Sequence, residues 1–141
     1  MHNEGERRHV ILVLHDIDET RYLMEKMLGK NDCYIILARN EEDAVARARS
    51  HPPDLILVSL GLEFKEHLLA AQRIRQMTDF GTNVAIVIFC IATIPEGAEV
   101  ELDRNIYAIR PDNFDQLRGF LHRVLERHPL PADPGFPMLN K

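Results

Sequence analysis

The feature that most constrains the fold is residues 54–61, Asp-Leu-Ile-Leu-Val-Ser-Leu-Gly. Pro52 and Pro53 keep the backbone extended before it, because proline disfavours the helical conformation in the residue that precedes it. The apolar run that follows is typical of a strand buried on both faces of a parallel sheet. We therefore expect a central strand that brings Ser59 to the carboxyl edge of the sheet, where ligands collect in open α/β folds.

Length and composition predict a single soluble domain. The 141 residues suffice for one three-layer core, and 45% hydrophobic with 28% charged residues is ordinary for a globular protein. No apolar run reaches the roughly 18 residues that a membrane helix needs, and the polar N-terminus lacks the layout of a signal peptide. We expect a cytoplasmic protein without membrane contact.

The net charge of -5, with no basic cluster, argues against nucleic-acid binding. Two predicted helices do carry a locally basic side, which we interpret as solvent-exposed: Arg47, Arg49, Arg73 and Arg75. Cys33 and Cys90 both lie in apolar runs, which predicts buried free thiols rather than a disulfide or a metal pair.

Apolar runs of strand length alternate with stretches of helical periodicity. The predicted strands are residues 9–14, 33–38, 54–59, 84–92 and 106–109, and the predicted helices are 19–28, 40–50, 68–77, 98–104 and 113–125. Asn40 and Asn113 are the predicted N-caps of the helices that follow them, Asn113 in a capping box with Gln116. This alternation predicts a parallel sheet covered by helices on both faces, with right-handed crossovers.

Three parts are expected along the chain: a polar N-terminal extension (1–8), one domain (9–127) and a tail (128–141) that carries four of the eight prolines. That proline density excludes a regular element in the tail, which is expected to be extended or disordered. Within the domain, Pro95 and Gly97 confine any helix before the last strand to residues 98–104.

Several of these segments resemble the receiver domain of bacterial response regulators: residues 10–16, 52–58, 68–75 and 107–111. The resemblance covers roughly residues 10–125 and needs no gap between Ser59 and Ile74. It implies a CheY-like, flavodoxin-like fold, which is a doubly wound five-stranded parallel sheet of order 2-1-3-4-5 in a three-layer α/β/α arrangement.

The resemblance also implies a phosphorylation switch. In the family, paired acids after strand one bind Mg²⁺, an aspartate ending strand three accepts phosphoryl from a histidine kinase, and a hydroxyl residue and a lysine read the phosphoryl group. Here the corresponding positions are His15 and Asp16, Ser59, Phe89 (Ile88 if the register slips by one) and Arg110. Tyr107 and Pro111 match the family pattern.

These substitutions remove the chemistry that the switch needs. A serine hydroxyl such as that of Ser59 is a weak nucleophile without an adjacent base, and Mg²⁺ requires hard oxygen ligands that this pocket has largely lost. We therefore predict a degenerate pseudo-receiver with lost or weak Mg²⁺ binding, no cofactor and no enzymatic activity. An ion pair between Asp16 and Arg110, direct or through water, would fill the pocket; the alternative is that Arg110 points to solvent.

The function expected from these inferences is a signalling module of a two-component (phosphorelay) system that acts through protein contacts. Its partner would be a histidine kinase or an output protein, with a homodimer left open. The expected contact surface is that around helix four, strand five and helix five, with Tyr107, Pro111 and Pro95.

Other functions are alternatives to this one. A phosphorelay receiver could use Asp18 or Glu63 as a non-standard acceptor. A small hydrolase could use Ser59 with His15 and Asp16, but the Gly-x-Ser-x-Gly elbow is missing. A nucleotide- or flavin-binding domain would need glycines that the loop at residues 14–20 lacks. A folded domain without an active signalling role also stays open.

Overall fold

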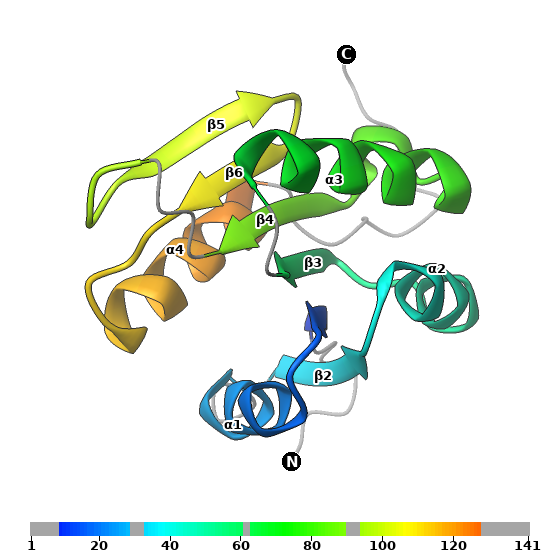
Figure 1. Ribbon diagram of the computed structural model, residues 1–141, viewed down its shortest axis with the longest axis horizontal. Coiled ribbons are helices and arrows are strands. Elements are labelled where there is room, and N and C mark those ends of the chain that lie inside the picture. Colours follow the sequence, from blue (N-terminus) through cyan, green and yellow to red (C-terminus); the bar gives the residue numbers. More distant parts are fainter. Residues whose placement is uncertain (1–8, 29–32, 61–62, 90–93, 128–141) are drawn as a thin grey trace, which may run out of the picture.

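The computed structural model describes residues 9–28, 33–60, 63–89 and 94–127 (Figure 1). Its sheet has the order β2-β1-β3-β4-β6-β5, in which all neighbouring strands are parallel except β5 and β6. The strands are β1 (His9–His15), β2 (Cys33–Ala38), β3 (Leu55–Ser59), β4 (Ala85–Phe89), β5 (Glu99–Asp103) and β6 (Ile106–Ile109). The helices are α1 (Asp18–Leu28), α2 (Glu41–Ser50), α3 (Phe64–Thr78) and α4 (Phe114–Arg127), with a short 3₁₀ turn at η2 (Gly81–Asn83).

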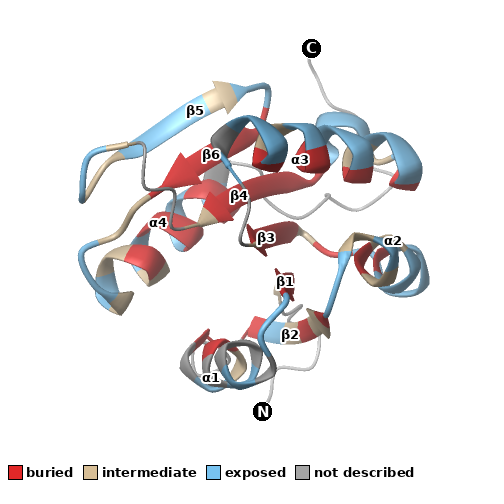
Figure 2. Ribbon diagram, in the orientation of Figure 1, coloured by how far each residue is buried: buried red, intermediate tan, exposed pale blue. Residues whose placement is uncertain are grey.

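Helices cover both faces of the sheet, which confirms the three-layer α/β/α prediction. Successive side chains of a strand point to opposite faces, so Leu55 and Leu57 pack toward α1 and α4, whereas Ile56 and Val58 pack toward α2 and α3. Figure 2 shows the buried residues concentrated in the strands and on the inner sides of the helices. All five residues of β3 are buried, as expected for a central strand.

The prediction of a helix at residues 98–104 is wrong. Those residues form β5, an edge strand that runs antiparallel to β6 and is joined to it through Arg104 and Asn105. The sheet therefore has six strands in the order 2-1-3-4-6-5, not five in the order 2-1-3-4-5. The reason is local: Val100 and Leu102 alternate with acids at the period of a strand, and Asn105 tolerates the left-handed φ of 56° that the tight turn requires.

The helix caps follow the sequence. The Asp43 N–H donates to Asn40 Oδ1 at 2.7 Å, and the Gln116 N–H donates to Asn113 Oδ1 at 2.9 Å. The second half of the predicted capping box is shifted by one residue, because Gln116 Oε1 accepts from the Asp112 N–H rather than from that of Asn113.

The buried face of α3 follows only part of the helical repeat formed by Leu68, Ala71, Ile74 and Met77. Met77 is 55% exposed, whereas His67 and Thr78 are buried beside Ala71 and Ile74. The core face of α3 is thus rotated away from Met77. It accepts two polar side chains because both form hydrogen bonds, His67 with the Leu60 N–H and Thr78 with the Ile74 carbonyl.

The arginines of α3 are not simply a solvent-exposed face. Arg73 forms a bidentate pair with Glu41 at 2.7 and 2.8 Å, which ties α3 to α2 and raises the pKa of its guanidinium. Arg75 is half-buried and donates to the carbonyls of Val84, Arg104 and Asn105. Burial lowers the pKa of Arg75, and these bonds hold α3 against the turn between β5 and β6.

Cys33 is buried, as predicted. Cys90, the extension at 1–8 and the tail at 128–141 lie outside the described residues, so those predictions stay open. No helix in the described part of the chain combines the length and the apolar character needed to cross a membrane.

Candidate functional site

The carboxyl ends of the parallel strands bring the predicted site residues to one edge of the sheet. His15 and Ser59 are direct neighbours in the register of β1 and β3. Phe89 pairs with Ile109 at the ends of β4 and β6, and Arg110 follows immediately. The strand order therefore assembles the edge that the sequence predicted.

His15 is held in one orientation by its own backbone. Its side chain is largely buried, and Nδ1 accepts a hydrogen bond from the Ile17 N–H at 3.1 Å. Asp16 is exposed, with Oδ1 3.5 Å from the same Nδ1. A neutral ring that accepts at Nδ1 carries its proton on Nε2, so it has no free lone pair with which to take a proton from Ser59. This geometry counts against the hydrolase alternative.

His67 is a site residue that the sequence analysis missed. It lies in the first turn of α3, is 2% exposed, and its Nε2 accepts from the N–H of Leu60, the residue that follows Ser59. Its Nδ1 is buried and has no hydrogen-bond partner among the described atoms. Burial lowers the pKa of His67. The helical spacing of His67, Ala71 and Ile74 could have placed it on the buried face.

An apolar hollow occupies the side of the edge where the family has its hydroxyl residue. Phe89 is partly buried against the core and lines this hollow of about 190 Å³ together with Pro111, Phe114 and Leu117. A phenyl ring cannot donate a hydrogen bond to a phosphoryl oxygen. The surroundings of Phe89 therefore favour apolar contact.

Arg110 is bound to the segment before β5. Its Nη1 donates to the Ile94 carbonyl at 3.0 Å, and its backbone N–H donates to the Ala98 carbonyl, also at 3.0 Å. A direct pair with Asp16 is not found among the ion pairs that join described residues. The water-bridged form of the pair stays a prediction.

Tyr107 does not lie on the predicted contact surface. It is 3% exposed, its hydroxyl donates to Asn105 Oδ1 at 3.0 Å, and its ring packs edge-on against Phe120 at 5.8 Å. Of the other two residues expected there, Pro95 is exposed and Pro111 is half-buried. The helix four of the expected surface is replaced by the strand β5.

The donor set at this edge does not fit Mg²⁺. Asp16 supplies a carboxylate, whereas the adjacent positions offer the imidazole of His15 and the hydroxyl of Ser59. Mg²⁺ is bound through oxygen ligands in near-octahedral geometry and usually through carboxylates. Within the described ranges, no cluster of three His, Cys, Asp or Glu side chains is arranged for a metal ion. Glu63 is exposed before α3, and the side chain of Asp18 lies outside the described part.

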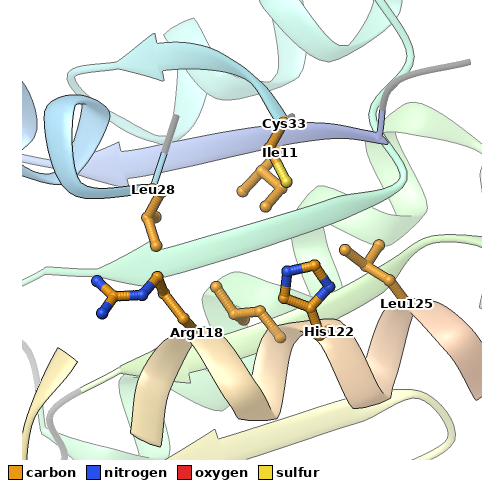
Figure 3. Close-up of a pocket in the computed structure, with 7 residues that line it drawn as sticks. Ile11, Leu28, Cys33, Arg118, His122 and Leu125 are labelled. Carbon is orange, nitrogen blue, oxygen red and sulfur yellow. The ribbon is translucent and has the colours of Figure 1, made fainter. Parts of the chain in front are cut away.

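A second hollow, between α1 and α4, is too small for a ligand. Figure 3 shows Arg118 and His122 of α4 facing Leu28, Ile11 and Cys33 across it. Its volume is about 10 Å³, close to the roughly 10–15 Å³ that a single water needs. We assign no function to it.

Comparisons with known proteins agree with this architecture. No protein-family profile matches the chain. The transcriptional regulatory protein KdpE of Staphylococcus aureus is 30% identical over 119 residues, which are 83% of this chain and 49% of KdpE. The chain thus spans about half the length of this curated relative.

Solved structures share the fold at lower identity. The chemotaxis protein CheY4 of Vibrio cholerae has a TM-score of 0.64 at 19% identity and covers 84% of this chain and 100% of its own. TrrA of Thermotoga maritima, solved in complex with Mg²⁺ and BeF, has a TM-score of 0.62 at 22% identity. The match covers 83% of this chain and 99% of TrrA. A receiver-modulated diguanylate cyclase of Pelobacter carbinolicus has a TM-score of 0.65 at 16% identity, and the match covers 85% of this chain and 94% of that one.

Sheet order, helix placement and these similarities lead to one conclusion: the chain has the CheY-like α/β fold that solved receiver domains of response regulators share.

Proposed function

We propose that this receiver-type domain signals without phosphorylation, through contacts with a protein partner. The observation that carries the proposal is the pairing of His15 with Ser59 at the edge where the family has acids. Ser59 offers no carboxylate at the acceptor position, and among the described residues of the edge only Asp16, which is exposed beside His15, offers a carboxylate to a metal ion. Phosphoryl transfer depends on positioning and charge neutralisation, and these residues supply neither.

The partner we propose is a histidine kinase or an output protein. KdpE is named a transcriptional regulatory protein, and this chain matches about half of its length. Contact with nucleic acid or a membrane by this domain itself is not part of the proposal, because its net charge is -5. Neither a catalytic activity of its own nor a resident cofactor is part of it, and its place of action would be the cytoplasm.

Incubation with acetyl phosphate and Mg²⁺, followed by intact-mass measurement, tests the proposal. The expected result is an unmodified mass, and beryllofluoride should leave the amide resonances of residues 15, 16 and 59 unchanged. A receiver that keeps its acid pair and aspartate, treated in parallel, controls for the reagents. A stable phosphoryl adduct on the wild-type chain would contradict the proposal.

A non-standard acceptor is the second candidate, supported by the exposure of Glu63 just before α3. If the mass increases by one phosphoryl group, fragmentation of the adduct locates the modified residue. Loss of the adduct in Glu63→Gln, but not in the exposed-site control Glu42→Gln, would establish this alternative. An adduct that survives Glu63→Gln would exclude Glu63 as the acceptor.

A further inference from the structure

The hollow beside Phe89 lies on the face of the sheet that α1 and α4 cover (Figure 1). Phe89 and Phe114 pack against the core cluster on this face, and Pro111 and Leu117 complete the apolar wall of the hollow. Its volume is about 190 Å³. An apolar cavity of roughly 150 Å³ is large enough to bind benzene. The hollow therefore has the size to accept one aromatic side chain.

The sequence restricts which part of this chain could supply that side chain. Among the residues outside the described ranges, Phe136 is the only aromatic one. The described chain that follows Phe89 resumes at Ile94, which packs against the core cluster on the opposite face of the sheet and accepts a hydrogen bond from Arg110. The chain after β4 thus leads from the face that holds the hollow to the other face.

The C-terminal tail is long enough to bring Phe136 to the hollow. Helix α4 runs from Phe114 to Arg127, so at 1.5 Å per residue its last residue lies about 15 Å from Leu117 and about 20 Å from Phe114 along the helix axis. The nine residues 128–136 span up to about 30 Å when extended. Leu130, only three residues beyond α4, reaches no further than about 10 Å and falls short of the hollow.

The residues around Phe136 favour an extended docking segment. Pro134 and Pro137 flank Gly135 and Phe136, and proline restricts the backbone before folding, so less entropy is lost when such a segment is ordered. Proline-rich segments of this kind dock in polyproline II conformation into hollows lined by aromatic side chains. Phe89 and Phe114 provide such a lining.

We propose that the C-terminal tail folds back along α4 and places the ring of Phe136 in the hollow. The docked tail would cover Phe89 at the carboxyl edge of the sheet, and an aromatic side chain of a partner protein would enter the hollow only by displacing it. This contact within the chain goes beyond the proposed function and does not depend on whether the domain is phosphorylated.

NMR of the full chain with labelled leucine methyl groups tests the contact. Nuclear Overhauser effects should join the Phe136 ring to the Leu117 methyl groups. Phe136→Ala should shift the Leu117 methyl resonances, because the ring that lies against them is lost. Leu130→Ala is the matched control: it removes an apolar side chain from the same tail, but one that cannot reach the hollow, and it should leave these resonances unchanged.

Fluorescence gives a second measurement, because the chain contains no tryptophan. In Phe136→Trp the introduced indole should emit at shorter wavelength and be quenched less by acrylamide than the indole of Leu130→Trp. Adding Phe89→Thr to Phe136→Trp removes part of the apolar wall and should weaken docking by about tenfold. Its emission should then move toward that of Leu130→Trp, in a protein whose amide spectrum remains folded.

Three outcomes would overturn the proposal. The first is that Phe136→Ala leaves the Leu117 methyl resonances unchanged and that both introduced indoles emit alike. The second is a set of contacts to Leu117 from Ile91 in place of Phe136. The third is contact only between labelled and unlabelled copies in a mixed sample, which would make a second copy the occupant. A phosphoryl adduct after acetyl phosphate treatment would contradict only the proposed function, since the contacts of Phe136 are measured independently.

Discussion

Among single residues, His67 joins the end of β3 to helix α3 at the carboxyl edge. It is buried, and its Nε2 accepts the Leu60 N–H directly after Ser59. Protonation of Nε2 would replace an acceptor by a donor that faces another donor, and it would place a charge in a buried position. The junction between β3 and α3 therefore depends on a neutral imidazole.

The stability of the domain should consequently fall in mild acid. Because burial lowers the pKa of the folded His67 below its ordinary value of 6.5, the unfolded chain binds the proton at a higher pH than the folded one. The contribution of His67 to the free energy of unfolding is thus constant above about pH 7.5 and decreases as the pH falls below about 6.5. The loss is complete once the pH is below the pKa of His67 in the folded domain. His67→Gln keeps an acceptor that does not titrate, and should reduce this loss by on the order of 1 kcal/mol.

Urea unfolding at about pH 7.5 and about pH 5 measures the effect. His51→Gln, at an exposed position in the same domain, is the control and should keep the wild-type pH dependence. If His67→Gln and wild type lose equal stability in acid, His67 does not hold the junction as argued.

The site residues differ in how far the sequence could predict them. The positions of Ser59, His15 and Arg110 follow from strand register, which the apolar runs and the spacing of the chain determine. The contacts of Arg110 and Tyr107 do not, because they depend on where β5 lies. The partners of Arg110, Ile94 and Ala98, are set by a part of the chain that the sequence assigned to a different element.

Among the elements, the β5–β6 hairpin depends on Asn105. Asn105 is buried, has a left-handed φ of 56°, donates through Nδ2 to the Thr82 carbonyl and accepts from the Tyr107 hydroxyl. One side chain thus joins the turn, the η2 segment and the core aromatic residue. Arg75 supports the same turn from α3 through the carbonyls of Arg104 and Asn105.

Asn105→Ala should destabilise the domain by roughly 2–4 kcal/mol, because it leaves buried polar groups unpaired and puts an alanine at positive φ. Asn105→Gly removes the same hydrogen bonds without the backbone strain, so it should cost about 1 kcal/mol less. Thermal or urea unfolding measures both.

Tyr107→Phe removes only the hydrogen bond from the Tyr107 hydroxyl to Asn105, so it should lower the free energy of unfolding by less than Asn105→Ala does. If Asn105→Ala is no less stable than Asn105→Gly, the left-handed backbone of residue 105 is not a significant constraint on the hairpin.

The wrong prediction of a helix at residues 98–104, where the structure has β5, has a local physical explanation. Five residues are too few to distinguish a short strand from a short helix by composition, and acids are uncommon in strands. The alternation of Glu99, Val100, Glu101 and Leu102 was nevertheless a strand signal. The four helices and the other five strands, by contrast, were predictable because each carries a continuous apolar run, a helical apolar repeat or an N-cap.

For the whole molecule, the receiver-type fold and the phosphorylation chemistry are separable. The core consists of β1, β2, β3, β4 and β6 with the inner sides of four helices, whereas His15, Ser59 and Phe89 lie at the strand ends. Substituting the end residues therefore leaves the buried apolar area, which supplies most of the stability, nearly unchanged. This explains why the fold can persist where the acids are absent.

That separation predicts how the domain responds when acids are returned to the edge. His15→Asp combined with Ser59→Asp places three carboxylates together with Asp16, so without metal the double variant should lose about 1–3 kcal/mol from charge repulsion and burial. Mg²⁺ binds the folded form and should restore stability by linkage, raising Tm with concentration. The wild type should show no rise beyond that in NaCl of equal ionic strength, because its edge offers Mg²⁺ one carboxylate. A Tm that rises equally with Mg²⁺ in the wild type would mean that the native residues do hold the ion, and the phosphorylation-independent function would have to be abandoned.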